Sequence, residues 1–252
     1  MPSFSLEGKV ALINGGSRGI GEAIAKEFAA RGASLILSSR KQEALDRVAN
    51  DIKAAGGSAV GIACHSGKVG QVDALFERIK TEFDRLDVLV NNAATNPYFG
   101  PILGATEQAF DKTFEVNTKG YFFMAQRAAA IMVEQKAGSI VNIASVEGLS
   151  PSPMMGVYSM SKAAVVMLTK VLARELGAAN VRANCICPGL TETKFASVLV
   201  NTPEIHDQYV QHAPMGRHAQ PEEMIGAALY LASDASSYTN GAIITCDGGM
   251  SV

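Results

Sequence analysis

Tyr158 and Lys162 stand four residues apart in the segment GVYSMSKAAVVMLTKVLARELG, a spacing that places both side chains on one face of a helix. A free tyrosine has a pKa near ~10 and is a poor base at neutral pH. A neighbouring ammonium favours the phenolate, so we expect Lys162 to lower the pKa of Tyr158 and make it a proton-transfer group. An ordinary amphipathic helix surface shows the same spacing, so the pair needs further support.

Two more polar residues supply that support. Ser145 follows the apolar run SIVNIA, and Asn117 lies in FEVNTKG. Ligands of open parallel sheets bind beyond the carboxyl ends of the strands. A hydroxyl at such a strand end can donate a hydrogen bond to a developing oxyanion. We therefore expect Ser145 to lie near Tyr158 at one edge of a sheet.

A glycine-rich turn, VALINGGSRGIGEAIAKEFAARG, joins the first apolar run to the first helical pattern. Its glycines are Gly15, Gly16, Gly19 and Gly21. Without Cβ atoms the backbone can turn tightly and approach a pyrophosphate, which then lies against helix N–H groups. A strand before the glycines and a helix after them is the context that indicates dinucleotide binding, although a tight turn without a ligand would also use glycine.

The next strand bears on which dinucleotide binds. A carboxylate at its end would hold the adenosine ribose of NAD, but this strand ends in Ser38, Ser39, Arg40 and Lys41. A hydroxyl and a guanidinium suit a 2′-phosphate. Arg40 and Lys41 could instead only solvate a helix start, where cations oppose the helix dipole. We predict NADPH as the cofactor in preference to NADH.

Short apolar runs alternate with amphipathic stretches along the whole chain, which predicts βαβ units and a mostly parallel sheet covered on both faces. We expect a single α/β domain over residues 1–252, a doubly wound Rossmann fold with mostly seven strands. A proline-rich segment at about 189–220 is expected to cover the active site. The expected strands are 9–14, 34–39, 58–63, 87–91, 138–144, 181–187 and 242–246, and the expected helices are 19–31, 41–55, 69–84, 106–136, 156–178 and 221–233.

Composition and charge exclude several other classes of protein. The net charge is −2 with no long basic run, so we expect neither nucleic acid nor an acidic membrane surface as a partner. No uncharged apolar run reaches ~18 residues, and neither a signal peptide nor a peroxisomal tripeptide is visible, so we expect a cytoplasmic protein. The four cysteines show no CxxC pair. His206, His212 and His218 recur every six residues, which does not fit one helix face, so no metal site is expected.

These motifs, in this order, resemble the short-chain dehydrogenase/reductase family over essentially the whole chain. The matching stretches are NGGSRGIG (14–21), NNAA (91–94), VNTKG (116–120), Ser145, YSMSK (158–162) and PGLTET (188–193). Asn14 departs from the threonine that is usual in the family, and we expect a mild effect because asparagine can also hydrogen-bond across the turn.

The resemblance implies roles for the site residues. Tyr158 would be the general acid in reduction, Ser145 would polarise the carbonyl, Lys162 would bind the nicotinamide ribose, and Asn117 would hold a water that links Lys162 to solvent. The residues that would contact the cofactor are Gly15, Ser17, Arg18, Gly19, Ile20, Ser39, Arg40, His65, Asn91, Ala93, Tyr158, Lys162, Pro188, Gly189, Thr191 and Thr193.

A narrower resemblance comes from SSRKQEALDRV, CHSGK (64–68) and NNAATNPYFGPI, which are similar to the tetrameric NADPH-dependent carbonyl reductase/retinol dehydrogenase subgroup. It implies a homotetramer that reduces a ketone or aldehyde to an alcohol. Reduction of a 3-oxoacyl thioester, carried on a carrier protein or coenzyme A, is an alternative. A catalytically idle NADPH-binding sensor or scaffold is another. Glu147, two residues after Ser145, either touches the substrate or is simply solvated.

Overall fold

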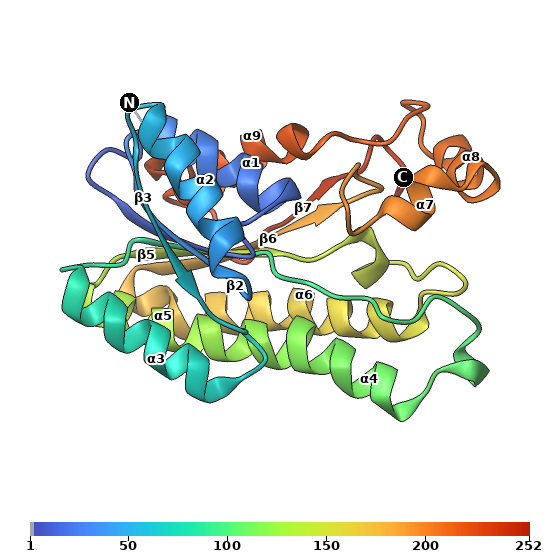
Figure 1. The fold of residues 1–252 in the computed structure, drawn as a ribbon, viewed down its shortest axis with the longest axis horizontal. Helices are drawn as coiled ribbons and strands as arrows, with labels where there is room; N and C mark the ends of the chain where they lie inside the picture. The colour runs from blue at the N-terminus through green and yellow to red at the C-terminus, as the bar shows by residue number, and fades with distance from the viewer. Residues whose placement is uncertain (1–2) are drawn as a thin grey trace.

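The computed structural model describes residues 3–252, except for the side chains of residues 198, 204, 205 and 208. All seven named strands form one parallel sheet in the order β3-β2-β1-β4-β5-β6-β7 (Figure 1). The strands are β1 (Val10–Asn14), β2 (Ser34–Ser39), β3 (Ser58–Ala63), β4 (Val88–Asn91), β5 (Gly138–Ile143), β6 (Val181–Pro188) and β7 (Ile243–Cys246). This order confirms the predicted doubly wound Rossmann fold, because the chain direction across the sheet reverses between β1 and β4.

Helices cover both faces of the sheet, as its apolar strands require. One face is covered by α1 (Gly19–Ala30), α2 (Gln42–Ala54) and α9 (Ile225–Ala232). The apolar layer on this face includes Phe28 of α1 and Leu35 and Leu37 of β2. On the other face α3 (Val69–Glu82), α5 (Gly120–Gln135) and α6 (Gly156–Leu176) lie below the sheet in Figure 1. Since all seven strands share these two apolar layers, we infer that the chain folds as one domain.

The predicted helix over 106–136 is interrupted in the structure. Thr106 caps α4 (Glu107–Phe114) by accepting a hydrogen bond from the Ala109 N–H at 3.2 Å. A π-helical turn, η2 (Glu115–Lys119), then separates α4 from α5. The Gly120 N–H bonds to the Glu115 carbonyl, five residues back, which is the π pattern. Hydrophobic periodicity could not reveal this turn, because the helical direction continues through it.

The expected cover over 189–220 contains two short helices, α7 (Ser197–Asn201) and α8 (Pro203–His212). Pro203 occupies the first helical positions of α8, where its missing N–H costs nothing. A bridge between Thr191 and Ala219 ties the two ends of the cover together. Three 3₁₀ turns shape the nearby loops: η1 (Ile102–Gly104), η3 (Val146–Gly148) and η5 (Pro221–Met224). The first residues of the predicted helix 221–233 belong to η5.

Among the described residues one helical stretch, Gly156–Ala179, is long and apolar enough to cross a membrane by length and composition alone. Half of its apolar window is buried inside the protein. Its buried face carries the polar residues Ser161 and Lys162, and α6 packs against β6. We interpret this stretch as a core helix of the fold.

Candidate active site

The glycine turn after β1 has the close contacts that the sequence predicted. Gly15 and Gly19 adopt positive φ angles of 86° and 55°, a region that favours glycine. A Cβ on Gly21 would lie 2.2 Å from the Gly15 carbonyl oxygen, and one on Gly15 would lie 2.7 Å from the Ala93 nitrogen. Asn92 holds the same turn, since its Nδ2 donates to the Gly15 carbonyl at 3.0 Å. The turn therefore leaves no room for a side chain at Gly15 or Gly21.

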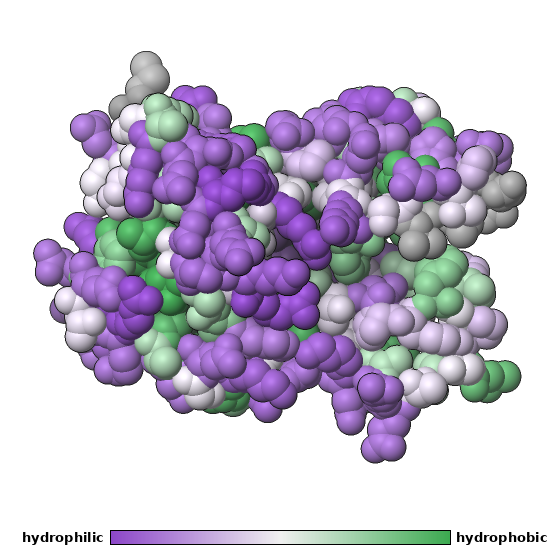
Figure 2. All heavy atoms as spheres, in the orientation of Figure 1, coloured by the Kyte–Doolittle hydropathy of each residue, from purple (hydrophilic) through white to green (hydrophobic). Residues whose placement is uncertain are grey.

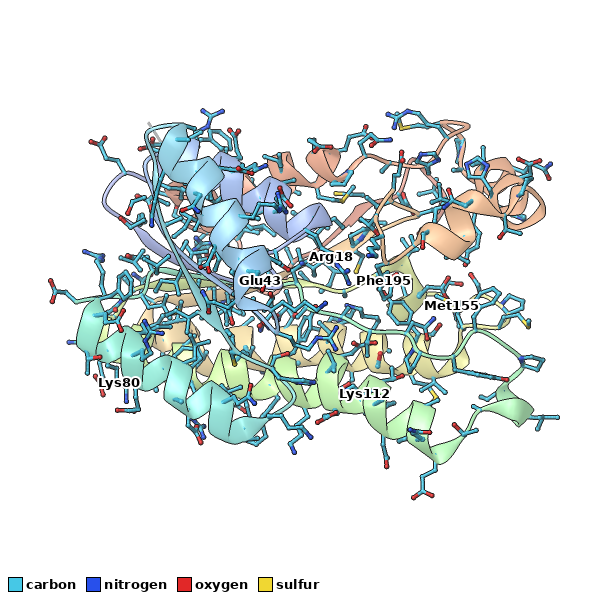
Figure 3. All side chains as sticks on the ribbon, in the orientation of Figure 1. Arg18, Glu43, Lys80, Lys112, Met155 and Phe195 are labelled. Atoms are coloured by element: carbon cyan, nitrogen blue, oxygen red, sulfur yellow. The ribbon has the colours of Figure 1, made fainter. Side chains whose placement is uncertain are left out.

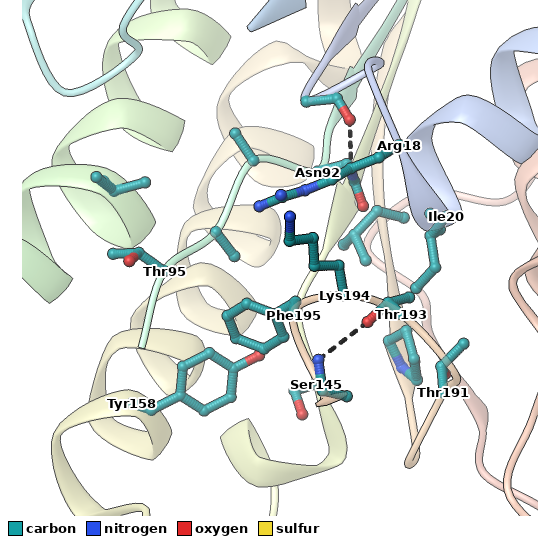
Figure 4. A pocket seen from close by; sticks show the side chains of 18 of the residues that line it. Arg18, Ile20, Asn92, Thr95, Ser145, Tyr158, Thr191, Thr193, Lys194 and Phe195 are labelled. Carbon is teal, nitrogen blue, oxygen red and sulfur yellow. Dashed lines mark hydrogen bonds between the residues drawn. The ribbon is translucent and has the colours of Figure 1, made fainter. Parts of the chain in front are cut away.

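A cavity of about 350 Å³ begins at this turn and follows the carboxyl edge of the sheet to Tyr158 (Figure 4). It has the size of a small-molecule site. We call the part lined by the glycine turn, the end of β2 and Lys112 the glycine half, and the part lined by η3, the start of α6 and the cover the tyrosine half. The predicted site residues that line the cavity are Gly15, Ser17, Arg18, Gly19, Ile20, Ser39, Arg40, His65, Ala93, Ser145, Tyr158, Lys162, Pro188, Gly189, Thr191 and Thr193.

Asn91 was expected to line the cofactor, but its side chain lies inside the sheet and outside the cavity lining. Asn14, Asn91 and Asn142 face one another on adjacent strands. The Nδ2 of Asn14 donates to Asn91 Oδ1 at 3.4 Å, and the Nδ2 of Asn91 donates to Asn142 Oδ1 at 3.1 Å. Asn14, the departure from the family pattern, thus joins a buried amide row. Asn14 and Asn92 both line the cavity, whereas Asn91 does not.

Asn117 also lies outside the cavity lining, fully buried in the π turn η2. Its Oδ1 accepts from the Thr95 N–H at 2.8 Å, and its Nδ2 donates to the Thr95 carbonyl at 2.9 Å and to Ser161 Oγ at 3.0 Å. The side chain therefore fixes the segment after β4 against α6. Its contact is with Ser161, next to Lys162 in the chain, and the expected water relay stays a prediction.

Tyr158, Ser145 and Lys162 come together at the inner wall of the tyrosine half. Tyr158 is 6% exposed and Lys162 is 1% exposed. The Lys162 ammonium donates to the Ile143 carbonyl at 2.8 Å and lies 5.7 Å from the centre of the Tyr158 ring. The Oγ of Ser145 accepts from the Glu147 N–H at 3.2 Å, which orients the hydroxyl at the end of β5. The structure thus brings together the three residues expected to act on a carbonyl.

The pKa of Tyr158 differs from the expectation. Burial raises it well above its ordinary value, and the hydrogen bond with Ser145 only partly opposes this rise. Burial also lowers the pKa of Lys162 to about 8. In the protein alone the net shift of the Tyr158 pKa is therefore upward, because loss of water outweighs the hydrogen bond with Ser145. The lowering of this pKa expected from Lys162 stays a prediction. A protonated phenol is the form that can donate a proton.

Cationic side chains gather in the glycine half of the cavity, while Lys162 and Lys194 belong to the tyrosine half. The glycine half is lined by Arg18, Arg40, Lys41 and Lys112. Figure 3 shows Arg18 and Lys112 on opposite sides of the cleft. His65 joins this group, with its Nε2 3.0 Å from the Lys112 ammonium; burial, and then this ammonium, lower the pKa of the His65 imidazole. Four cations and a glycine cradle without room for side chains fit an anionic dinucleotide.

Three residues that line the cavity were not predicted as site residues: Lys112, Lys194 and Phe195. A fourth, Glu147, was expected either to touch the substrate or to be solvated, and it also lines the cavity. Figure 4 shows Lys194 extending from the cover toward the side of Arg18 and Asn92. The Phe195 ring lies against Tyr158, with 5.8 Å between ring centres. Lys112 could have been suspected from its place one turn before VNTKG, but no local signal marks the two cover residues.

Two histidines of the cover, His206 and His218, contact each other. The Nε2 of His206 lies 3.0 Å from His218 Nδ1, and the Nε2 of His218 lies 3.2 Å from Glu192 Oε2. These contacts join α8 to both ends of the cover. Polar contacts therefore hold together the cover that lines the tyrosine half.

Comparison with known proteins agrees with this geometry. Residues 15–251 match the family model described as Enoyl-(Acyl carrier protein) reductase. The chain is 37% identical over 244 residues to Dehydrogenase/reductase SDR family member 4 of Oryctolagus cuniculus, covering 97% of this chain and 94% of that protein. This chain belongs to the short-chain dehydrogenase/reductase family. It is therefore an oxidoreductase of a family that uses a nicotinamide cofactor.

Two solved structures of the family are similar over nearly their whole length. A gluconate 5-dehydrogenase from Burkholderia cenocepacia, in complex with NADP and tartrate, has a TM-score of 0.95 and 32% identity, covering 98% of this chain and 97% of that one. A 3-oxoacyl (acyl-carrier-protein) reductase from Agrobacterium tumefaciens C58, with NADP bound, has a TM-score of 0.91 and 36% identity, covering 98% and 95%. Relatives this similar act on different substrates, so family membership alone does not specify the substrate.

Proposed function

We propose that the protein reduces a ketone or aldehyde to an alcohol with NADPH. The observation that carries this proposal is the arrangement of one cavity, in which the buried Tyr158 and Lys162 and the half-buried Ser145 lie at one end, and four cations and a glycine turn lie at the other. The cations and the turn fit the phosphates of a dinucleotide. The phenol, hydroxyl and ammonium fit proton transfer to a carbonyl.

Each of the three residues has a distinct part in this chemistry. NADPH, when bound, supplies the hydride that reduces the carbonyl carbon. Tyr158 gives its phenolic proton to the carbonyl oxygen. The raised pKa of Tyr158 keeps this proton on the phenol at neutral pH, so that it is available for transfer. Ser145 donates a hydrogen bond to the same oxygen. Lys162 stabilises the phenolate that remains, because an ammonium beside a phenolate favours its charge.

The preference for NADPH over NADH rests on the end of β2. Ser39, Arg40 and Lys41 line the glycine half, and no acidic residue lines that half among the described residues. An acid there would serve the free ribose hydroxyl of NAD, while a guanidinium serves a 2′-phosphate. Both similar structures named above contain NADP, which supports the same choice.

Reduction of a 3-oxoacyl thioester is the second candidate, favoured by the similarity to the 3-oxoacyl reductase of Agrobacterium tumefaciens. It involves the same proton transfer and differs in what enters the tyrosine half. An idle sensor or scaffold is less consistent with the site, because Tyr158, Ser145 and Lys162 are all present and converge.

We also infer a homotetramer in the cytoplasm. The outer face of α4, α5 and α6 exposes large apolar side chains, including Phe122 (44%), Met160 (47%) and Met167 (58%). Exposed apolar side chains gathered on one face are typical of subunit interfaces. Light scattering of the purified protein tests this inference, and a monomer at micromolar concentration would contradict it.

An NADPH-oxidation screen tests the proposed activity. The panel contains aryl ketones, diketones, retinal and acetoacetyl thioesters, each assayed with NADPH and with NADH. We expect turnover of simple ketones with NADPH at higher catalytic efficiency than with NADH. Turnover of the acetoacetyl thioesters alone would support the second candidate, and no turnover of any compound would support the idle protein.

A further inference from the structure

Glu147 is the one acidic residue among the described residues that line the cavity. It lies in η3, two residues after Ser145, and is 5% exposed. The other charged side chains of the lining are cations. A buried carboxylate in a pocket is unusual, because removing it from water costs free energy unless other groups satisfy it.

Hydroxyl and amide groups satisfy this carboxylate. Its Oε1 accepts from Ser152 Oγ at 2.6 Å, and its Oε2 accepts from the Ser152 N–H at 2.9 Å and from Ser159 Oγ at 2.9 Å. In all three contacts a carboxylate oxygen of Glu147 accepts the hydrogen bond. No ion pair among the described residues includes Glu147. Its negative charge therefore stands without a cationic partner.

Two phenols of the tyrosine half feel this charge. Burial raises the pKa of Tyr209, on α8 of the cover, and the Glu147 carboxylate raises it further. For Tyr158, burial again comes first and Glu147 adds to the rise. A negative charge disfavours a phenolate nearby. Both phenols line the cavity, so Glu147 lies close to the space between them.

We propose that Glu147 is a specificity-determining residue that excludes carbonyl compounds with a negative charge close to the carbonyl and favours neutral or cationic ones. This inference rests on the proposed function, because it concerns what enters the tyrosine half beside Tyr158. A substrate carboxylate there would lose its water and face a second carboxylate in a partly desolvated site, where like charges repel strongly. The NADPH phosphates escape this repulsion because they belong to the cationic glycine half.

The matched variant is Glu147→Gln. Glutamine can place its oxygen where Oε2 accepts two hydrogen bonds, and its NH₂ can donate to the Ser152 hydroxyl, which can rotate to accept it. The variant thus removes the charge and keeps the contacts. Glu134→Gln, exposed on α5 and remote from the cavity, removes the same charge elsewhere and serves as control.

The test compares three aryl ketones of similar shape: methyl 4-acetylbenzoate, 4-acetylbenzoate and 4-acetylbenzylamine. For the native protein and the control we expect kcat/KM to fall at least about tenfold from the ester to the acid, through KM, with the amine no worse than the ester. In Glu147→Gln we expect the ratio of kcat/KM between ester and acid to shrink about tenfold. An unchanged ratio in the variant would overturn the proposal.

Two other measurements test the role of Glu147 if the variant does not fold or if no ketone is reduced. If Glu147→Gln does not fold, the native protein alone decides, because equal catalytic efficiency for the amine, ester and acid contradicts the role of Glu147. If no ketone is reduced, the proposed function fails, and the order of affinities of the same three compounds, measured as thermal stabilisation in the presence of NADP, still tests Glu147. If 4-acetylbenzoate then stabilises the protein as much as its methyl ester does, the proposed role of Glu147 is rejected.

Discussion

The two halves of the cavity differ in what shapes them. In the glycine half, backbone geometry dominates: Gly15 and Gly21 have neighbours so close that a Cβ would collide with backbone atoms. In the tyrosine half, side chains from η3, α6 and the cover meet, as Phe195 does with Tyr158. Figure 2 shows mainly hydrophilic side chains over the α1–α2 side of the molecule. We infer that the glycine half binds the dinucleotide cofactor that the family shares, and that the tyrosine half binds the substrate of this protein.

The largest effect that can break this comparison is expected from Gly21→Ala. Its Cβ would lie 2.2 Å from the Gly15 carbonyl oxygen, so the turn must open. We expect NADPH affinity to fall by about 100-fold, because the helix N–H groups that face the pyrophosphate move. Fluorescence titration of NADPH measures this. Gly70→Ala in α3, with nothing within 4 Å of its new Cβ, is the control. An unchanged NADPH affinity in Gly21→Ala would show that the turn is not the cofactor cradle.

A somewhat smaller effect is expected for Arg40→Ala. Loss of a guanidinium that binds a 2′-phosphate should reduce kcat/KM with NADPH by about tenfold to 100-fold, because hydrogen bonds to charged groups contribute about 1.5–3 kcal/mol. Activity with NADH should stay nearly constant. Lys53→Ala, exposed at the end of α2, controls for the lost charge. Equal losses with both cofactors would contradict the predicted phosphate contact.

Phe195→Ala examines the other half of the cavity. Its ring lies 5.8 Å from the Tyr158 ring and is 42% exposed. Removing it takes apolar surface from the wall beside the carbonyl, so we expect KM for an aryl ketone to rise about fivefold. KM for NADPH should not change, and steady-state kinetics with each substrate varied in turn measures both. A parallel rise in the two KM values would mean that the halves are not independent.

The smallest predicted effect concerns pH. Burial lowers the pKa of Lys162 to about 8, so this ammonium is charged below pH 8 and loses its proton as the pH rises through that value. Because the charge stabilises the phenolate left on Tyr158, kcat/KM for ketone reduction should fall about fourfold between pH 7 and pH 8.5. The pH–rate profile measures this. A profile that stays level to pH 9 would contradict the role given to Lys162.

The sequence predicted much of the glycine half and less of the tyrosine half, for a physical reason. A glycine turn between a strand and a helix, and the end of β2, are local in the chain, and all of their predicted lining residues line the cavity. Asn91 lies outside the cavity lining because its side chain bonds to Asn14 and Asn142 on the adjacent strands, a pairing that depends on the register of the sheet. The contacts of Glu147 with Ser152 and Ser159, and of Phe195 with Tyr158, depend on how separate loops fold together, which no local pattern encodes.

The pKa values of Tyr158 and Lys162 also depend on contacts that the sequence pattern does not show. The i, i+4 spacing correctly placed Lys162 beside the ring, 5.7 Å from its centre. The spacing could not show that both side chains are almost completely buried, and burial governs both pKa shifts. The direction of each shift is therefore a property of the tertiary structure.

The most direct measurement of the central claim is ketone reduction by Tyr158→Phe, with NADPH affinity determined on the same preparation. Phenylalanine keeps the ring against Phe195 and removes only the hydroxyl that gives the proton. The account predicts that turnover falls by about 10²–10⁴-fold while the affinity for NADPH falls far less. Turnover close to that of the native protein would contradict it.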